Sequence, residues 1–306
     1  MTENELIKRL TANLPTDETV VVGTGDDCAV LNIGDHMILY KTDATVEGVH
    51  FKKNTIPELI GHKALARPLS DIAAMGGTPT HSLITLGTNP EITSEYIERL
   101  YEGLKRCAEK HNVNIVGGET TTLTNLTLSI CLLGAVENPI TRVGSKAGDA
   151  IFVSGELGGS IIEHHLNFTP RLEQGRWLAK EFDLHAMIDL SDGLATDLHH
   201  LLGKNLGADL LASAIPISNS AKLRAKEAPS GKTALLAALT DGEDYELLFT
   251  LPGKDAIKLH DAWKEKFPDL SLKCIGKITG APGIILRDKK TIHTLTAHGY
   301  DHLQKP

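Results

Sequence analysis

The sequence predicts a fold of mixed helices and strands, α/β or α+β in layers, divided into two domains. Stretches with the 3.6-residue apolar period of helices and short apolar runs typical of strands are mixed in both halves of the chain. The chain has 306 residues, which is enough for about two hydrophobic cores. Aromatic residues make up only 4% of the chain, so these cores are expected to be mainly aliphatic.

Strands and helices are predicted in turn along the first half of the chain. The strands are expected over residues 37–42, 81–88, 114–116 and 126–136. The first helix is expected to begin at Pro57 and to stop at Gly76-Gly77, and Pro68 is expected to kink or split it. The second helix is expected to begin at the Thr93-Ser94 pair, because either hydroxyl can accept a backbone N–H group of a first helical turn.

A domain boundary is predicted in residues 141–148, which carry Arg, Lys, Gly and Ser without a helical or strand period. Residues 1–140 are expected to form an N-terminal domain, and residues 141–306 a C-terminal domain. In the second half, strands are expected over residues 149–154, 186–190, 245–251 and 271–279. Helices are expected over residues 194–206 and 254–267, and the glycine-rich turn 155–160 is expected to open a further helix.

Composition argues against several classes of protein. The formal net charge is −8, with 39 acidic and 31 basic residues and no basic run, so the sequence gives nucleic-acid binding little support. The four cysteines form no C-x-x-C pair, which predicts reduced thiols rather than disulfides or a zinc site. No apolar stretch approaches the roughly 20 residues of a membrane span, and the N-terminus has no signal-peptide pattern. We therefore expect a cytoplasmic protein without membrane contact.

Carboxylates next to glycines and expected strand ends are the most informative feature of the chain. They are Asp26, Asp27, Asp43, Asp71, Asp189, Asp192, Glu243 and Asp244. Two carboxylates about 4 Å apart repel by roughly 4 kcal/mol near a protein surface. If these segments converge, the site must hold hard cations, and ligands that are all oxygen atoms indicate magnesium together with phosphate.

Each motif taken alone has an ordinary structural interpretation. Asp26-Asp27 and Gly117-Gly118 are typical of turns, and Asp192 is suited to cap a helix. His50 fits a hydrogen-bonded loop, Tyr101 lies on an apolar helical face, and Arg142 suits a solvated linker. The Gly-x-x-x-x-Gly-Lys-Ser/Thr phosphate-binding loop is absent from the sequence, so a nucleotide enzyme would need another way to hold phosphate.

The order of the motifs changes this assessment. Gly-Asp-Asp-Cys-Ala-Val (25–30) is followed by Leu-Ser-Asp-Ile-Ala-Ala-Met-Gly (69–76), Gly-Gly-Glu-Thr-Thr (117–121), Ile-Asp-Leu-Ser-Asp-Gly-Leu (188–194) and Gly-Glu-Asp-Tyr-Glu-Leu (242–247). In this order, and over essentially the whole chain, the sequence resembles the thiamine-monophosphate kinase family of the aminoimidazole ribonucleotide synthetase superfamily. The resemblance implies a two-domain fold whose N-terminal domain forms a homodimer through its sheet, with ATP bound near that interface.

The resemblance also implies roles for individual residues. The positions that would hold several magnesium ions are Asp27, Lys41, Thr42, Asp43, Asp71, Glu119, Asp189 and Asp192. Those that would contact ATP are Tyr101, Gly118, Glu119, Arg142 and Ser191. His50, Glu243 and Tyr300 would hold thiamine monophosphate. The implied reaction transfers the γ-phosphoryl group of ATP to the phosphate of thiamine monophosphate. That acceptor oxygen is already largely ionised at neutral pH, so no side chain is expected to act as a general base.

Several positions depart from the family pattern. Lys41 stands where Ser or Thr is usual, Glu119 where Asp is usual, Pro68 where Asn is frequent and Asp241 where Gly is common. An ammonium among the carboxylates would replace the charge of one cation, so Lys41 suggests fewer magnesium ions, unless its side chain points away. Two alternatives stay open: another superfamily enzyme that forms an acyl- or imino-phosphate, and a non-catalytic protein that binds nucleotide or thiamine phosphate.

Overall fold

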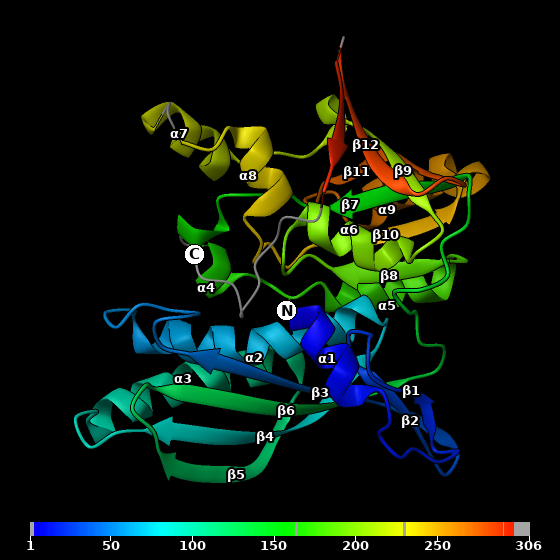
Figure 1. The fold of residues 1–306 in the computed structure, drawn as a ribbon. Helices are drawn as coiled ribbons and strands as arrows, with labels where there is room; N and C mark the ends of the chain where they lie inside the picture. Colours follow the sequence, from blue (N-terminus) through cyan, green and yellow to red (C-terminus); the bar gives the residue numbers. More distant parts are fainter. Residues whose placement is uncertain (1–2, 163, 229–230, 290, 297–306) are drawn as a thin grey trace.

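A computed structural model of the chain describes residues 3–162, 164–228, 231–289 and 291–296 (Figure 1). It has two β-sheets, one built from strands of the first half of the chain and one from strands of the second half. Helices lie between the two sheets and on the outer side of the second, which is the layered arrangement of helices and strands that the sequence predicts. No helix among these residues is long and apolar enough to cross a membrane.

The first sheet has the strand order β1-β2-β3-β6-β4-β5 within the described residues. Neighbouring strands are antiparallel except for the parallel pair β4–β5. The elements are α1 (Glu3–Thr11), β1 (Val20–Val22), β2 (Ala29–Ile33), β3 (His36–Val46), α2 (Pro57–Ala74), β4 (Thr78–Thr88), α3 (Ser94–His111), β5 (Asn114–Thr122) and β6 (Thr127–Val136). Helices α2 and α3 pack against each other, and α2 also packs on β3 and β6 (Figure 1).

The second sheet has the strand order β13-β12-β9-β11-β7-β10-β8 within the described residues. Its strands are β7 (Asp149–Ser154), β8 (Ala186–Asp189), β9 (Gly207–Leu211), β10 (Leu247–Pro252), β11 (Leu272–Thr279), β12 (Gly283–Asp288) and β13 (Thr291–Leu295). Its helices are η1 (Ser160–Ile162), α4 (His164–Asn167), α5 (Leu172–Glu181), α6 (Leu194–Leu202), η2 (Ala212–Ala214), α7 (Asn219–Glu227), α8 (Ala234–Thr240), η3 (Gly253–Asp255) and α9 (Ala256–Lys266). Every residue of β7 is buried, as expected for a central strand covered on both faces.

Helix α2 joins the two halves of the molecule. It contacts α3 and the first sheet on one side, and α4, α5 and β8 on the other (Figure 1). The larger apolar cluster accordingly includes Leu39 and Ile72 from the first half and Phe152 and Tyr245 from the second. This cluster therefore spans both halves, with α2 bringing them into contact, whereas a second apolar cluster that includes Ile151 and Leu198 lies within the second half.

Among the differences from the expected elements, three concern α2, β5 and β3, which carry predicted site residues. Helix α2 continues through Pro68 as one helix, because packing on both sides stabilises it by more than the roughly 3 kcal/mol that an interior proline costs. Strand β5 runs on through Gly117-Gly118-Glu119 to Thr122, because its ladder with β4 continues to Thr88. Asp43 lies inside β3, opposite Ile130 of β6, and not at the end of a strand.

Candidate active site

Three aspartates from distant parts of the chain meet at the contact between the two halves. Asp27 lies in the loop before β2, Asp71 lies in α2, and Asp189 ends β8. One carboxylate oxygen of each lies within 4.8 Å of the others, and all three side chains are buried. We call Asp27, Asp71 and Asp189 the acid cluster. It brings three of the predicted metal ligands together.

The surroundings of the acid cluster suit a hard cation. Burial raises the pKa of Asp189 to about 7, and the nearby charge of Asp27 adds to this effect. Burial also raises the pKa of Asp71 well above its usual range, against the opposing charge of Lys41. Among the described residues, Oδ2 of Asp27 and Oδ1 of Asp189 have no hydrogen-bond partner. Buried oxygen atoms without a donor are the ligands that a divalent cation such as Mg²⁺ accepts.

Two basic side chains point into the acid cluster. Nζ of Lys41 lies 2.8 Å from Oδ1 of Asp71 and 3.8 Å from Oδ1 of Asp43. The alternative in which Lys41 points away from the carboxylates is therefore wrong. Burial disfavours the charged lysine, but Asp71 and Asp43 outweigh this and raise the pKa of Lys41. Arg142 donates from Nε and Nη2 to Oδ1 of Asp27, so its guanidinium already pairs with a predicted metal ligand.

A cavity lies on the face of the first sheet that α2 does not cover. It has a volume of about 630 Å³, and its lining includes Lys41 and Thr42 of β3 and Gly118 and Glu119 of β5. Gly118 has φ +155°, and a Cβ atom there would lie 1.8 Å from the carbonyl oxygen of Ile84. The close approach of β5 to β4 therefore requires glycine at this position. Residues predicted to bind metal and residues predicted to bind ATP thus line the same cavity.

A second group of polar residues lies where α2 meets the second half of the chain. Nζ of Lys63 donates to the carbonyl oxygen of His50 at 2.8 Å and to Oε1 of Glu243 at 2.6 Å. It also lies 2.8 Å from Nδ1 of His165, which is 3.3 Å from Oε2 of Glu243. Sequence analysis named His50 and Glu243 and missed Lys63 and His165. The segment around Lys63 also carries His62 and Arg67, so no local signal set Lys63 apart.

The backbone at Glu243 adopts an uncommon conformation. Glu243 and Tyr245 have φ values of +54° and +51°, in the left-handed region that non-glycine residues seldom occupy. The N–H group of Glu243 donates to the carbonyl oxygen of Ser191 at 2.7 Å. The Tyr245 hydroxyl donates to Oε1 of Glu243 at 3.2 Å and accepts from Nε of Arg67 at 3.1 Å. Local strain of this kind persists where surrounding contacts hold it, frequently at binding sites.

The remaining predicted site residues lie in different settings. Tyr101 is half-buried on α3 and packs against the larger apolar cluster. Asp192 does not cap α6: the cap is Gly193, and the N–H groups of both residues donate to Oδ2 of Asp197. Asp244 is buried and accepts from the N–H group of Gly158. Tyr300 lies outside the described residues.

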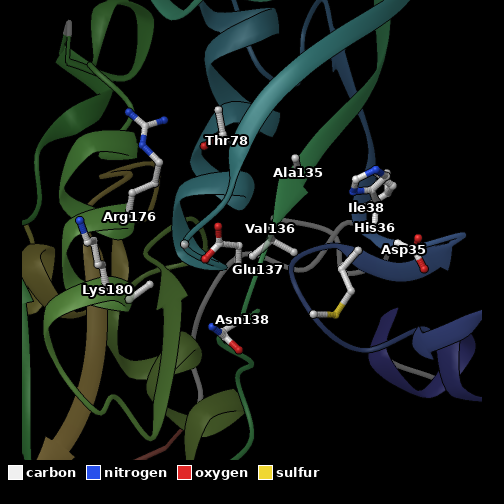
Figure 2. Close-up of a pocket in the computed structure, with 13 residues that line it drawn as sticks. Asp35, His36, Ile38, Thr78, Ala135, Val136, Glu137, Asn138, Arg176 and Lys180 are labelled. Atoms are coloured by element: carbon white, nitrogen blue, oxygen red, sulfur yellow. The ribbon is translucent and has the colours of Figure 1, made fainter.

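A larger cavity lies away from these residues. It has a volume of about 910 Å³ and is lined by the ends of β3 and β6 together with α5. Figure 2 shows Arg176 and Lys180 on one side of it and Asp35 and His36 on the other. Its lining includes no residue of the acid cluster and none of the predicted site residues. Cavity size therefore does not locate the chemistry in this protein.

Comparisons with known proteins show which family the chain belongs to. Residues 25–136 match the family described as AIR synthase related protein, N-terminal domain. The thiamine-monophosphate kinase of Rhodopirellula baltica is 38% identical over 278 residues, covering 87% of this chain and 85% of the relative. That of Haemophilus influenzae is 33% identical and covers 100% of this chain and 99% of the relative.

Solved structures show the same relationship. A structure of AaThiL complexed with AMPPCP and TMP has a TM-score of 0.81 and 30% identity, and covers 99% of this chain and 97% of its own. The hydrogenase maturation protein HypE of E. coli, at 18% identity and a TM-score of 0.72 over 96% of both chains, shares the fold. From these identities and coverages, the chain belongs to the thiamine-monophosphate kinase family.

Proposed function

We propose that this protein transfers the γ-phosphoryl group of ATP to the phosphate of thiamine monophosphate, giving thiamine diphosphate and ADP. The observation that carries the proposal is the acid cluster, whose buried carboxylates lie at the contact between the two halves. Membership of the thiamine-monophosphate kinase family supports the choice of substrates, since a relative structure contains both AMPPCP and TMP.

The acid cluster is the proposed centre of the magnesium site. Asp27, Asp71 and Asp189 would supply buried oxygen ligands, and Thr42, Asp43, Glu119 and Asp192 are the further candidates. Bound magnesium would supply positive charge to phosphate oxygens during transfer. We propose that Lys41 supplies one positive charge of its own beside Asp71, so that this protein binds fewer ions than a family member with Ser or Thr at this position.

The proposed ATP site extends along the cavity beside β3 and β5. Gly118 and Glu119 line it, Arg142 contacts Asp27 of the acid cluster, and Ser191 follows Asp189 by two residues. We propose that Arg142 exchanges Asp27 for a phosphate group of ATP when nucleotide and magnesium bind. A guanidinium can form a bidentate pair with a carboxylate or with a phosphate. Tyr101, half-buried on α3, is the least supported member of this set.

The proposed acceptor site lies between His50 and Glu243. The Val46 N–H group donates to Nδ1 of His50 at 3.0 Å, and Lys63 donates to the His50 carbonyl oxygen, so both the ring and the backbone of His50 are held at this site. Glu243 carries a negative charge that suits the cationic thiazolium ring, and Tyr300 is proposed as its aromatic partner. The acceptor phosphate is itself the nucleophile, so positioning and charge neutralisation suffice without a general base.

A homodimer through the first sheet and a domain boundary at residues 141–148 complete the proposal. Strand β5 is largely exposed, and Tyr40, Leu83 and Val116 present apolar side chains on the first sheet. Exposed apolar groups on one sheet support a partner subunit there.

The test is an assay with purified protein, ATP, magnesium and thiamine monophosphate, following both products by chromatography. Equal amounts of thiamine diphosphate and ADP, lost on addition of EDTA, are expected. ADP without thiamine diphosphate would point to a different acceptor. Neither product, with magnesium-dependent nucleotide binding retained, would identify a non-catalytic binding protein.

A further inference from the structure

Lys63 of α2 is a fully buried lysine that touches both halves of the molecule. Its side chain is 0% exposed. Its ammonium lies within 2.8 Å of three groups: the His50 carbonyl oxygen from the first half, and Oε1 of Glu243 and Nδ1 of His165 from the second. The carbonyl oxygen and the carboxylate each accept an N–H group of the ammonium, and Nδ1 of His165 also lies 3.3 Å from Oε2 of Glu243.

Stability alone is a poor reason for a charged group in this place. Taking an ammonium out of water costs several kcal/mol, and replacing a buried ion pair by packed apolar side chains is frequently neutral or stabilising. The partners of Lys63 indicate another role. Two of the three, His50 and Glu243, are the residues proposed to bind the phosphate acceptor, and they come from segments separated by nearly two hundred positions in the sequence.

The groups around Lys63 keep the Glu243 carboxylate ionised. Burial raises the pKa of Glu243, but hydrogen bonding from His165 and the charge of Lys63 outweigh this and lower it to about 2. Burial lowers the pKa of Lys63 to about 8, with Glu243 opposing the change, so the lysine is mostly protonated at neutral pH. The Glu243 side chain remains 26% exposed, so part of the carboxylate is open to solvent although its Oε1 atom is bound by the buried Lys63.

We propose, building on the function proposed above, that Lys63 is a positioning residue for the phosphate-acceptor site. It fixes the distance between the His50 segment of the first half and the Glu243 carboxylate of the second. The phosphate end and the cationic ring of one acceptor molecule are then bound together. Lys63 itself is buried and does not touch the acceptor. Its effect is therefore on acceptor binding, and much less on nucleotide binding or on transfer in the saturated enzyme.

The test compares Lys63→Met with a matched control, Arg171→Met. Arg171 forms a largely buried ion pair with Glu246, three residues beyond Glu243 and outside the Lys63 contacts. Both substitutions remove a largely buried positive charge that pairs with a glutamate of the second half. KM for thiamine monophosphate, KM for ATP, kcat and the thermal midpoint are measured for both variants and for the wild type.

We expect Lys63→Met to raise KM for thiamine monophosphate at least tenfold, with KM for ATP and kcat within about threefold of wild type. Arg171→Met should lower the thermal midpoint and leave KM for thiamine monophosphate unchanged. If Lys63→Met keeps the wild-type KM for thiamine monophosphate, or changes all parameters in parallel with Arg171→Met, the inference is overturned.

A second variant keeps the test informative if Lys63→Met does not fold. Lys63→Gln retains N–H groups for the His50 carbonyl and loses the charge, so it should show a smaller rise in KM for thiamine monophosphate. A wild-type value in this variant would also overturn the inference. A wild-type protein that forms no thiamine diphosphate would instead remove the proposed function, and this inference with it.

Discussion

The ammonium of Lys41 lies 2.8 Å from Oδ1 of Asp71, beside two further buried carboxylates of the acid cluster. One carboxylate of a proposed metal site is therefore already neutralised by a side chain of the same protein. A lysine is a compact and permanent charge here, whereas a magnesium ion is exchangeable. The balance between the two decides how many ions the site takes up.

Lys41→Thr is expected to increase the number of magnesium ions bound, because Asp71 loses its ammonium and needs a cation in its place. Isothermal titration of the nucleotide complex with Mg²⁺, or Mn²⁺ titration followed by electron paramagnetic resonance, counts the ions. Lys105→Thr is the control, since Lys105 pairs with the exposed Glu102. An unchanged number of ions in Lys41→Thr would contradict this prediction.

Arg142→Gln is expected to destabilise the magnesium-free protein by about 3 kcal/mol, because Asp27 stays buried without its counter-charge. Added magnesium should restore most of this loss by taking over the role of the guanidinium. Urea unfolding with and without magnesium measures both effects. Arg99→Gln, which breaks an exposed pair with Glu58, should cost less than about 1 kcal/mol and show no magnesium dependence.

Gly118→Ala and Gly117→Ala form a matched pair on β5. Both glycines have a positive φ near 155°, so backbone strain is similar. An alanine Cβ at 118 would lie 1.8 Å from the Ile84 carbonyl oxygen, whereas at 117 the nearest atom is 3.5 Å away. Gly118→Ala should therefore be less stable by at least about 2 kcal/mol in urea unfolding. Equal stability of the two variants would show that β5 does not approach β4 this closely.

The stability difference between wild type and Glu243→Gln should depend on pH. The pKa of Glu243 is lowered to about 2 in the folded protein from an ordinary value of 4.5. The unfolded chain therefore binds more protons between these values, and the stabilisation is present above about pH 4.5 and lost as the pH falls. Between pH 6 and pH 4 the difference in unfolding free energy should shrink by about 1 kcal/mol. A difference that does not change with pH would contradict the lowered pKa.

Local sequence signals were sufficient for many elements of the fold. Strand β7 has the predicted bounds 149–154, and the Thr93 hydroxyl caps α3 by accepting the N–H group of Tyr96. Such elements follow from short-range patterns. Proline and glycine suggest interruption locally, yet α2 is not split at Pro68 and β5 extends beyond its expected end. Packing of α2 on both sides and the ladder of β5 with β4 outweigh that preference.

The residues of the candidate site likewise fall into those that the sequence predicted and those that it did not. The family resemblance implied that Asp27, Asp71 and Asp189 bind magnesium, and the structure brings one carboxylate oxygen of each within 4.8 Å of the others. Lys63 and His165 were missed. A lysine in a helix and a histidine in a short turn are both compatible with solvent, and nothing local predicts that they meet.

By itself, the sequence determined the kind of chemistry: the order of its acidic and glycine-rich motifs indicated phosphoryl transfer, and their types indicated oxygen ligands. Only the tertiary structure decided which charges meet. Lys41 pairs with Asp71, Arg142 donates to Asp27, and Lys63 donates to Glu243, which lies 180 positions away in the sequence. The physical reason is that such pairings depend on how α2 packs between the two halves, and the energy of a buried charge depends on its neighbours in space.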